Sequence, residues 1–283
     1  MSLSPAHVRQ FYQEGFTIFE NALTPTELES LRTECDILVN HIYNEKDLLF
    51  DAGCIVEPLS CGYVDHDLSH PEAYKHDQAF YRRIRSQIND EVLEITLHKI
   101  AAMAEQVLPI GPDRRLYLLN EQYIVKPPRS GTKARFQWHQ DSEYMPLACR
   151  RVPTVACWIA LDDVSEANGT LLIDPYPSPS ANKVSTSSLD HHAQFSSFYS
   201  PTPSSTPFAA TILAGSVVLM SSVLRHCSTG NDSGRFRRAF MPQYSAGVVW
   251  SDRVMRERGE PGIEQPVKDS RELLAMAVPC GGR

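Results

Sequence analysis

The residues best suited to chemistry lie in the segment 136–144, which reads FQWHQDSEY. On an extended backbone successive side chains point to opposite faces, so His139 and Asp141 are expected to project the same way. One imidazole and one carboxylate that converge on a point supply two of the three protein ligands of a 2-His-1-carboxylate iron site. In a chain with 10 histidines a single His-x-Asp triplet carries little weight, so a third ligand is needed from elsewhere.

His226 is the third ligand that we predict. It follows the strand-like run 213–220, so His139 and His226 are expected on two separate strands or strand ends, which a barrel can bring together. Such a set leaves three positions of the metal open for a cosubstrate and O2. His66 and His70 could also lie one helical turn apart and bind a metal, but the lack of an apolar stripe around them favours a solvated loop.

A basic strand follows His226. If 2-oxoglutarate binds the metal, its far carboxylate needs a cation, and a planar guanidinium binds a carboxylate through two hydrogen bonds. Alternation places Arg235 and Arg237 on one face and Arg238 on the other. We select Arg237, because Arg235 lies nearer the preceding turn and solvent. Ser228, two residues after His226, could add a hydroxyl donor.

The elements that must position these residues follow from periodicity. Capping signals at Ser4-Pro5 and at 24–27 predict two helices, and the first of them ends at Gly15. Apolar residues at spacings of three and four predict one long helix over 78–107. The runs with strand character are 16–19, 116–125, the His139 segment, 155–161, 170–173, 213–220 and 235–240.

These elements predict a mainly β protein with flanking helices (α+β), built as a barrel or sandwich. The 283 residues, 42% of them hydrophobic, are expected to form one domain, 1–283. Two long segments without periodicity, about 45–77 and 174–207, are expected to act as lids rather than linkers, because strand patterning resumes after them. Residues 250–283 read as a polar tail around a short helix.

Composition limits the class of protein. The net charge of −7 and the absence of a long basic run argue against a nucleic-acid surface. No apolar segment reaches the 18 residues of a membrane span, and no secretory pattern opens the chain, so a soluble cytoplasmic protein is expected. The seven cysteines include no CxxC pair, which favours reduced thiols. The expected partner is a small molecule, and a homodimer stays open.

Taken in order, the motifs resemble the phytanoyl-CoA dioxygenase (PhyH) family of Fe(II)/2-oxoglutarate-dependent oxygenases. The resemblance covers roughly residues 8–245 and rests on the segments 15–16, 23–25, 126–128, 139–141, 158–163, 168–171, 226 with 231, and 237–239. It implies a double-stranded β-helix (jelly-roll, cupin-like) core, Fe(II), and 2-oxoglutarate and O2 as cosubstrates. It also implies metal ligation by His139, Asp141 and His226, and cosubstrate contacts from Arg237, Ser228, Lys126 and Trp158.

The same resemblance implies hydroxylation, desaturation or cyclisation at an unactivated C–H bond of a small organic substrate, in secondary-metabolite biosynthesis. Asp141 disfavours halogenation, because related halogenases carry a small residue at that position. The alternatives are an acyl-CoA 2-hydroxylase, a catalytically inactive metal- or oxo-acid-binding jelly roll, and a cupin-like enzyme that uses another metal. Where the family usually has Pro-Gly-Ser-His, this chain reads DPYPS at 174–178, so the substrate is left open.

Overall fold

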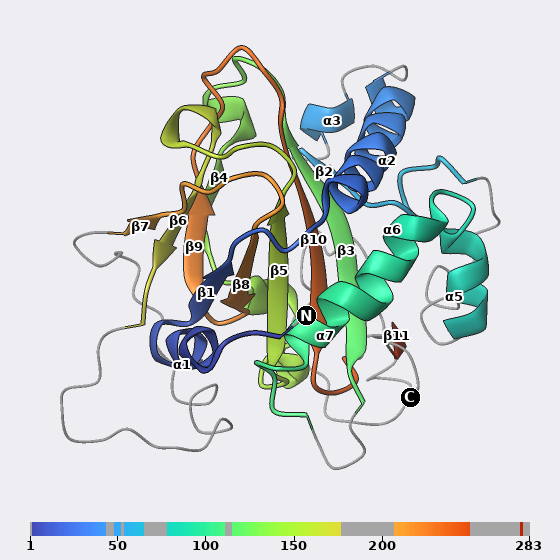
Figure 1. The fold of residues 1–283 in the computed structure, drawn as a ribbon. Helices are drawn as coiled ribbons and strands as arrows, with labels where there is room; N and C mark the ends of the chain where they lie inside the picture. Colours follow the sequence, from blue (N-terminus) through green and yellow to red (C-terminus); the bar gives the residue numbers. More distant parts are fainter. Residues whose placement is uncertain are drawn as a thin grey trace.

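The computed structural model describes most of the chain, namely residues 2–43, 48–51, 54–64, 78–110, 115–176, 207–249 and 278–279. Its strands form two antiparallel sheets, and several helices lie against the larger one (Figure 1). In sheet order the larger comprises β1 (Phe16–Phe19), β8 (Val217–Ser221), β5 (Thr154–Ala160), β10 (Arg237–Ser245), β3 (Tyr117–Lys126) and β11 (Val278–Pro279), with β2 (Ile55–Val56) also paired to β3. The smaller comprises β4 (Phe136–His139), β9 (Arg225–Ser228), β6 (Leu171–Asp174) and β7 (Phe208–Ala209).

The helices include several short ones. They are α1 (Pro5–Glu14), α2 (Pro25–Tyr43), α3 (Leu48–Asp51), α5 (Gln78–Arg85), α6 (Asp90–Glu94), a π-helical turn (Ile95–Ile100), α7 (Ala101–Ala104) and the 3-10 turns Thr132–Ala134, Asp141–Tyr144, Leu147–Cys149 and Glu166–Asn168. The mainly β architecture with flanking helices agrees with the sequence analysis.

Both predicted N-terminal helices are confirmed, with their caps. The Ser4 hydroxyl accepts a hydrogen bond from His7 N, and Gly15 ends α1 in the left-handed region at φ 83°. At the start of α2, Thr24 N donates to Glu27 Oε2 at 2.7 Å, while Glu27 N donates to Thr24 Oγ1 at 3.3 Å.

The single long helix expected over 78–107 is wrong. The chain breaks between α5 and α6, because the Asn89 side chain accepts a hydrogen bond from Val92 N at 3.2 Å and caps a new helix. From α6 the chain continues through the π-helical turn into α7. The break lets α5 turn away from the line of α6 and α7, as Figure 1 shows. Arg85, at the end of α5, is fully buried as a result.

Strand β5 lies between two parts of the core. All of its residues are buried, and its two faces pack into different hydrophobic clusters. Cys157 and Ile159 belong to a cluster that includes Leu31 of α2, so this face of the sheet packs against the helices. Trp158 and Ala160 alternate with them and belong to a second cluster on the inner face, away from the helices. Burying one Leu or Ile side chain is worth about 1.5–3 kcal/mol, so the helix-covered face supplies much of the stability.

Several predicted features lie outside the described residues. They include most of the two lid-like segments, the histidines at 66 and 70, and most of the tail beyond residue 249. Within the tail, Val278 and Pro279 pair with Leu118 and Tyr117 as an edge strand, which the sequence analysis did not anticipate. None of the described helices is long and apolar enough to span a bilayer. No disulfide joins the six cysteines of the described ranges.

Candidate metal centre

Strands β4 and β9 of the smaller sheet bring the two predicted histidine ligands face to face. His139 is the direct partner of His226, and Phe136 is the partner of Ser228. Three steps along β4 therefore match two steps along β9, which is a β-bulge. Regular alternation would send Phe136 and His139 to opposite faces, whereas the bulge lets both face the same side as their partners. His226 thus lies within a strand of its own, rather than just past the end of the preceding strand as expected.

Asp141 reaches the histidines by a different route from the one expected. Strand β4 ends at His139, and Asp141 is the first residue of a 3-10 turn instead of the next residue of an extended strand. The two residues beside it are tied to the connection between β8 and β9. Ser142 N donates to Ser222 O at 2.9 Å, and Gln140 Nε2 donates to Val223 O. The backbone around Asp141 is therefore held against the start of the strand that carries the second histidine.

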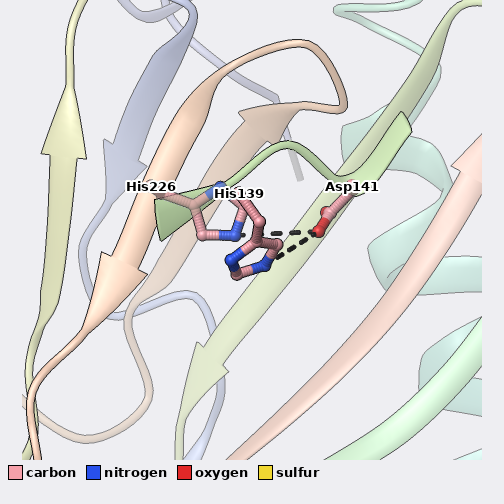
Figure 2. A group of neighbouring side chains, drawn as sticks. All are labelled: His139, Asp141 and His226. Carbon is pink, nitrogen blue, oxygen red and sulfur yellow. Dashed lines mark ion pairs between the residues drawn. The ribbon is translucent and has the colours of Figure 1, made fainter. Parts of the chain in front are cut away.

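The three side chains converge on one point, as Figure 2 shows. The Nε2 atoms of His139 and His226 each lie 3.7 Å from Asp141 Oδ1. All three potential ligand atoms lie within 4.8 Å of one another, so a single metal ion fits between them. We call these three residues the triad.

The protonation state of both imidazoles suits a metal. His139 Nδ1 lies 2.7 Å from Gln137 O, and His226 Nδ1 lies 3.1 Å from Leu224 O. A carbonyl oxygen can only accept, so each Nδ1 carries the proton and each Nε2 offers its lone pair to the centre. Burial, together with the neighbouring His139, lowers the pKa of His226 to about 4, which keeps this ring neutral at pH 7. Two imidazoles that present Nε2 and one carboxylate are the donor set of a 2-His-1-carboxylate iron site.

Gln243 on β10 completes the surroundings of Asp141. Its Nε2 donates to Asp141 Oδ2 at 2.9 Å, while Oδ1 of the same carboxylate faces the two histidines. The sequence analysis missed this residue. A usable signal was present, because alternation along the strand from Arg237 puts Gln243 on the same face.

A cluster of cations and donors lies next to this centre. Lys126 on β3 is the cross-strand partner of Arg237 on β10. Its Nζ donates to Ser228 Oγ at 2.7 Å and to Thr229 O, and it lies 5.3 Å from the centroid of the Phe136 ring. Since Ser228 is two residues after His226 on β9, the cluster borders the triad along one strand.

Arg237 is buried, and two of its three guanidinium nitrogens lack hydrogen-bond partners among the described residues. It is 1% exposed, and within the described ranges its Nε and Nη1 atoms make no hydrogen bond. The guanidinium carbon lies 5.4 Å from the centroid of the Trp158 ring, whose Nε1 is also buried and unsatisfied in the part of the chain that the structure describes. Three buried donors without acceptors cost free energy until an anion occupies the space they face.

The pKa values of the two cations agree with an anion site. Burial lowers the pKa of Arg237 to about 10. Burial, and then repulsion from Arg237, lowers the pKa of Lys126 to about 6. Gly169, at φ 101°, makes room for this lysine, because a Cβ there would lie 2.7 Å from Lys126 Cδ. A bound carboxylate would satisfy the donors and favour both charged forms.

The choice among the three arginines agrees with their burial. Arg235 is exposed, as expected for a residue beside the turn. Arg238 points to the other face of β10, where it forms ion pairs of 2.7 Å with Asp162 and with Asp36. Arg237 alone of the three lies on the inner face and is buried.

Comparisons with known proteins agree with this geometry. A curated relative, phytanoyl-CoA dioxygenase domain-containing protein 1 of Bos taurus, is 25% identical over 291 residues, which cover 88% of this chain and 93% of the relative. Among solved structures, the non-heme alpha-ketoglutarate-dependent carbocyclase SnoK from nogalamycin biosynthesis is 18% identical, with a TM-score of 0.57 and coverage of 97% of this chain and 96% of SnoK.

Two further structures contain ligands. The epimerase SnoN in complex with Fe3+, alpha-ketoglutarate and nogalamycin RO is 17% identical, with a TM-score of 0.57 and coverage of 98% and 95% of the two chains. EvdO2 from Micromonospora carbonacea var. aurantiaca, complexed with 2-oxoglutarate, is 17% identical, with a TM-score of 0.54 and coverage of 97% and 98%. At these identities the likenesses establish the jelly-roll fold. The family model described as Phytanoyl-CoA dioxygenase (PhyH) matches residues 11–239, and this chain therefore belongs to that family.

Proposed function

We propose that this protein is a non-haem Fe(II)- and 2-oxoglutarate-dependent oxygenase that hydroxylates an unactivated C–H bond of a small organic molecule in secondary-metabolite biosynthesis. The observation that carries the proposal is a triad beside a buried guanidinium with unsatisfied donors. Two imidazoles and a carboxylate would hold Fe(II) and leave three positions open. In this proposal the triad binds the metal, and the far carboxylate of 2-oxoglutarate contacts Arg237, Ser228, Lys126 and Trp158.

In the proposed reaction, different residues of the chain bind the metal and the oxo-acid. Bound Fe(II) and 2-oxoglutarate supply the activation of O2 that cleaving a strong C–H bond requires. His139 and His226 direct Nδ1 to backbone carbonyls and would present Nε2 to the metal, so these hydrogen bonds fix which ring nitrogen binds. Arg237, stacked on Trp158, fixes one end of the oxo-acid and excludes water from that end.

The open side of the centre indicates where the substrate approaches. The side chains of His139 and Asp141 are 15% and 11% exposed, whereas that of His226 is 5% exposed. Tyr144, which is 56% exposed, packs edge-on against the His139 ring at a centroid distance of 5.6 Å. We therefore infer that a small molecule enters past Tyr144. A small-molecule substrate is supported by the SnoN complex, and the carbocyclase and epimerase on this fold are reasons to keep cyclisation and desaturation beside hydroxylation.

The test begins with uncoupled turnover, which needs no substrate. Purified protein with Fe(II), 2-oxoglutarate and O2 should form succinate, and the anaerobic ternary mixture should show a visible charge-transfer band. Asp141→Ala should abolish both signals, whereas Asp232→Ala, at an exposed position, should leave them unchanged. Binding of metal and oxo-acid without succinate would instead support an inactive binding protein. Turnover that requires Zn or Ni and no oxo-acid would favour a cupin-like enzyme with another metal.

A further inference from the structure

We propose that Gln243 is a positioning residue that keeps Asp141 bound to the metal through one oxygen only. This inference rests on the proposed function, since it assigns the role of a neighbour of the metal ligand. The two oxygens of the carboxylate are in different surroundings. Oδ1 faces both histidines at 3.7 Å, and Oδ2 accepts the hydrogen bond from Gln243 Nε2 at 2.9 Å (Figure 2 shows the triad).

The strand is shaped to deliver this hydrogen bond. Gln243 shares the inner face of β10 with Arg237 and with the apolar residues Ala239 and Met241. A register irregularity on β10 falls between Gln243 and Tyr244, and such bulges re-aim side chains next to active sites. On β5 the cross-strand partner of Gln243 is Ala156, whose small side chain leaves room for the carboxamide.

The carboxylate is held by more than one contact. The partly buried carboxamide of Gln243 donates to Asp141 Oδ2. Asp141 is in turn held from two directions. The connection between β8 and β9 fixes the backbone through Ser142 and Gln140, and β10 fixes the free carboxylate oxygen. Rotation of the carboxylate about its own axis is thereby opposed.

The consequence concerns the coordination sphere. A carboxylate binds a metal through one oxygen or through both. Two-oxygen binding would use one of the three positions that the oxo-acid and O2 require. A hydrogen bond donated to Oδ2 stabilises the charge on that oxygen and lowers its affinity for the metal. Gln243 therefore preserves the open positions and also fixes the orientation of the ligand oxygen Oδ1. Its removal should impair oxo-acid binding, because a position is taken, and metal binding, because the ligand is no longer held in place.

The experiment uses Co(II) alone as the probe, followed by 2-oxoglutarate, on the full chain. Gln243→Met keeps length and removes the donor. We expect Co(II) affinity to fall by about 10- to 100-fold, the size seen when partners of metal ligands are removed. The visible spectrum of bound Co(II) should change, and added 2-oxoglutarate should perturb it less than in the wild type.

A second variant and a control accompany this test. Gln243→Asn keeps the carboxamide but shortens its reach, so it should behave like Gln243→Met. Asn120→Leu, at the β3 position opposite Gln243, is the matched control and should leave Co(II) binding and its spectrum unchanged.

Three outcomes separate the inference from the proposed function. If the wild type fails to bind Co(II), both are overturned. If the wild type binds Co(II) and Gln243→Met binds it with the same affinity and spectrum, only the inference fails. A wild-type response from Gln243→Asn would likewise overturn it, because a role in packing or polarity alone would tolerate the shorter amide. If Gln243→Met does not fold, the Asn variant carries the test by itself.

Discussion

Two arginines of the described ranges are fully buried, and their surroundings are opposite. Arg85, on α5, donates to both oxygens of Glu34 at 2.8 and 2.5 Å and to Glu121 Oε1 at 2.9 Å. These carboxylates raise the pKa of Arg85 well above its usual value, although burial opposes the shift. Arg237, on β10, makes no hydrogen bond through Nε or Nη1 within the described residues, and burial lowers its pKa to about 10.

This difference in hydrogen bonding indicates a structural role for Arg85 and a ligand-binding role for Arg237. The Arg85 cluster joins α2, α5 and β3, and it includes the hydroxyls of Tyr81 and Tyr123, which donate to the two carboxylates at 2.7 Å. The guanidinium of Arg85 is paired with carboxylates of the chain itself, although Glu121 Oε2 is buried without a hydrogen bond among the described residues. The cluster therefore attaches the helices to the sheet. Arg237 holds a charge whose Nε and Nη1 donors find no acceptor in the part of the chain that the structure describes. A buried cation of this kind is tolerated because a ligand pairs with it later, which is why we assign Arg237 to the oxo-acid and Arg85 to the fold.

The largest effect is expected from breaking the Arg85 cluster. Arg85→Met should lower the free energy of unfolding by about 3–5 kcal/mol, because it leaves Glu34 and Glu121 buried without a counter-charge. Chemical denaturation measures this loss. Arg82→Met on the same helix is the control, since Arg82 pairs with Glu94 at the surface and should cost at most about 1 kcal/mol. Equal losses from the two variants would contradict the structural role of Arg85.

Substitution of Arg237 by Met should affect ligand binding and leave stability intact, the reverse of the result expected for Arg85. Arg237→Met removes a buried charge whose Nε and Nη1 make no hydrogen bond to the described residues, so the free energy of unfolding should stay the same or rise. Binding of 2-oxoglutarate to the metal-loaded protein should weaken by about 1.5–3 kcal/mol, which is roughly 10- to 150-fold. Titration of the charge-transfer band measures the affinity. Arg238→Met, on the opposite face, should leave it unchanged, and equal weakening there would remove the distinction between the faces.

The sequence was informative where a residue's role depends on its own strand. Alternation alone separates Arg237 from Arg238, and the structure agrees, with one buried on the inner face and the other paired with Asp162. The spacing of apolar runs also placed His139 and His226 on different strands. The resemblance to the PhyH family, which the family model confirms over residues 11–239, rested on the order of such local motifs.

Features that depend on the register between distant segments were not predictable. The bulge that turns Phe136 and His139 to one face exists only in the pairing of β4 with β9. The contact of Gln243 with Asp141 joins residues 102 positions apart; alternation gives the face of Gln243 but not its partner. The role of Arg85 does not follow from the expected helix over 78–107, because its partner Glu34 lies 51 positions away. Asn89 is a residue type that caps helices, so a helix start there is visible in the sequence. Whether the chain breaks at Asn89 or continues as one helix depends on tertiary packing.

The smallest expected effect is a proton uptake when 2-oxoglutarate binds, and it distinguishes Lys126 from Arg237. With a pKa of about 6, Lys126 is mostly neutral at pH 7.5, whereas Arg237, at about 10, is charged. A carboxylate placed beside them favours the charged lysine, so 2-oxoglutarate should bind with uptake of a fraction of one proton. Calorimetric titration at pH 7.5 in buffers of different ionisation enthalpy measures that fraction, with Co(II) present to prevent turnover.

The substitution Lys126→Met should abolish the uptake, while Arg237→Met should weaken binding without abolishing it. The lowered pKa of Lys126 also predicts how the stability of the protein without oxo-acid depends on pH. Because the unfolded lysine titrates near its usual pKa of 10.5 and the folded one at about 6, the unfolded chain binds more protons between these values. The contribution of Lys126 to the free energy of unfolding should therefore rise as the pH increases from about 6 to 10.5. Binding without proton uptake would mean that the oxo-acid does not reach Lys126, and it would leave Arg237 as the cation that the site uses.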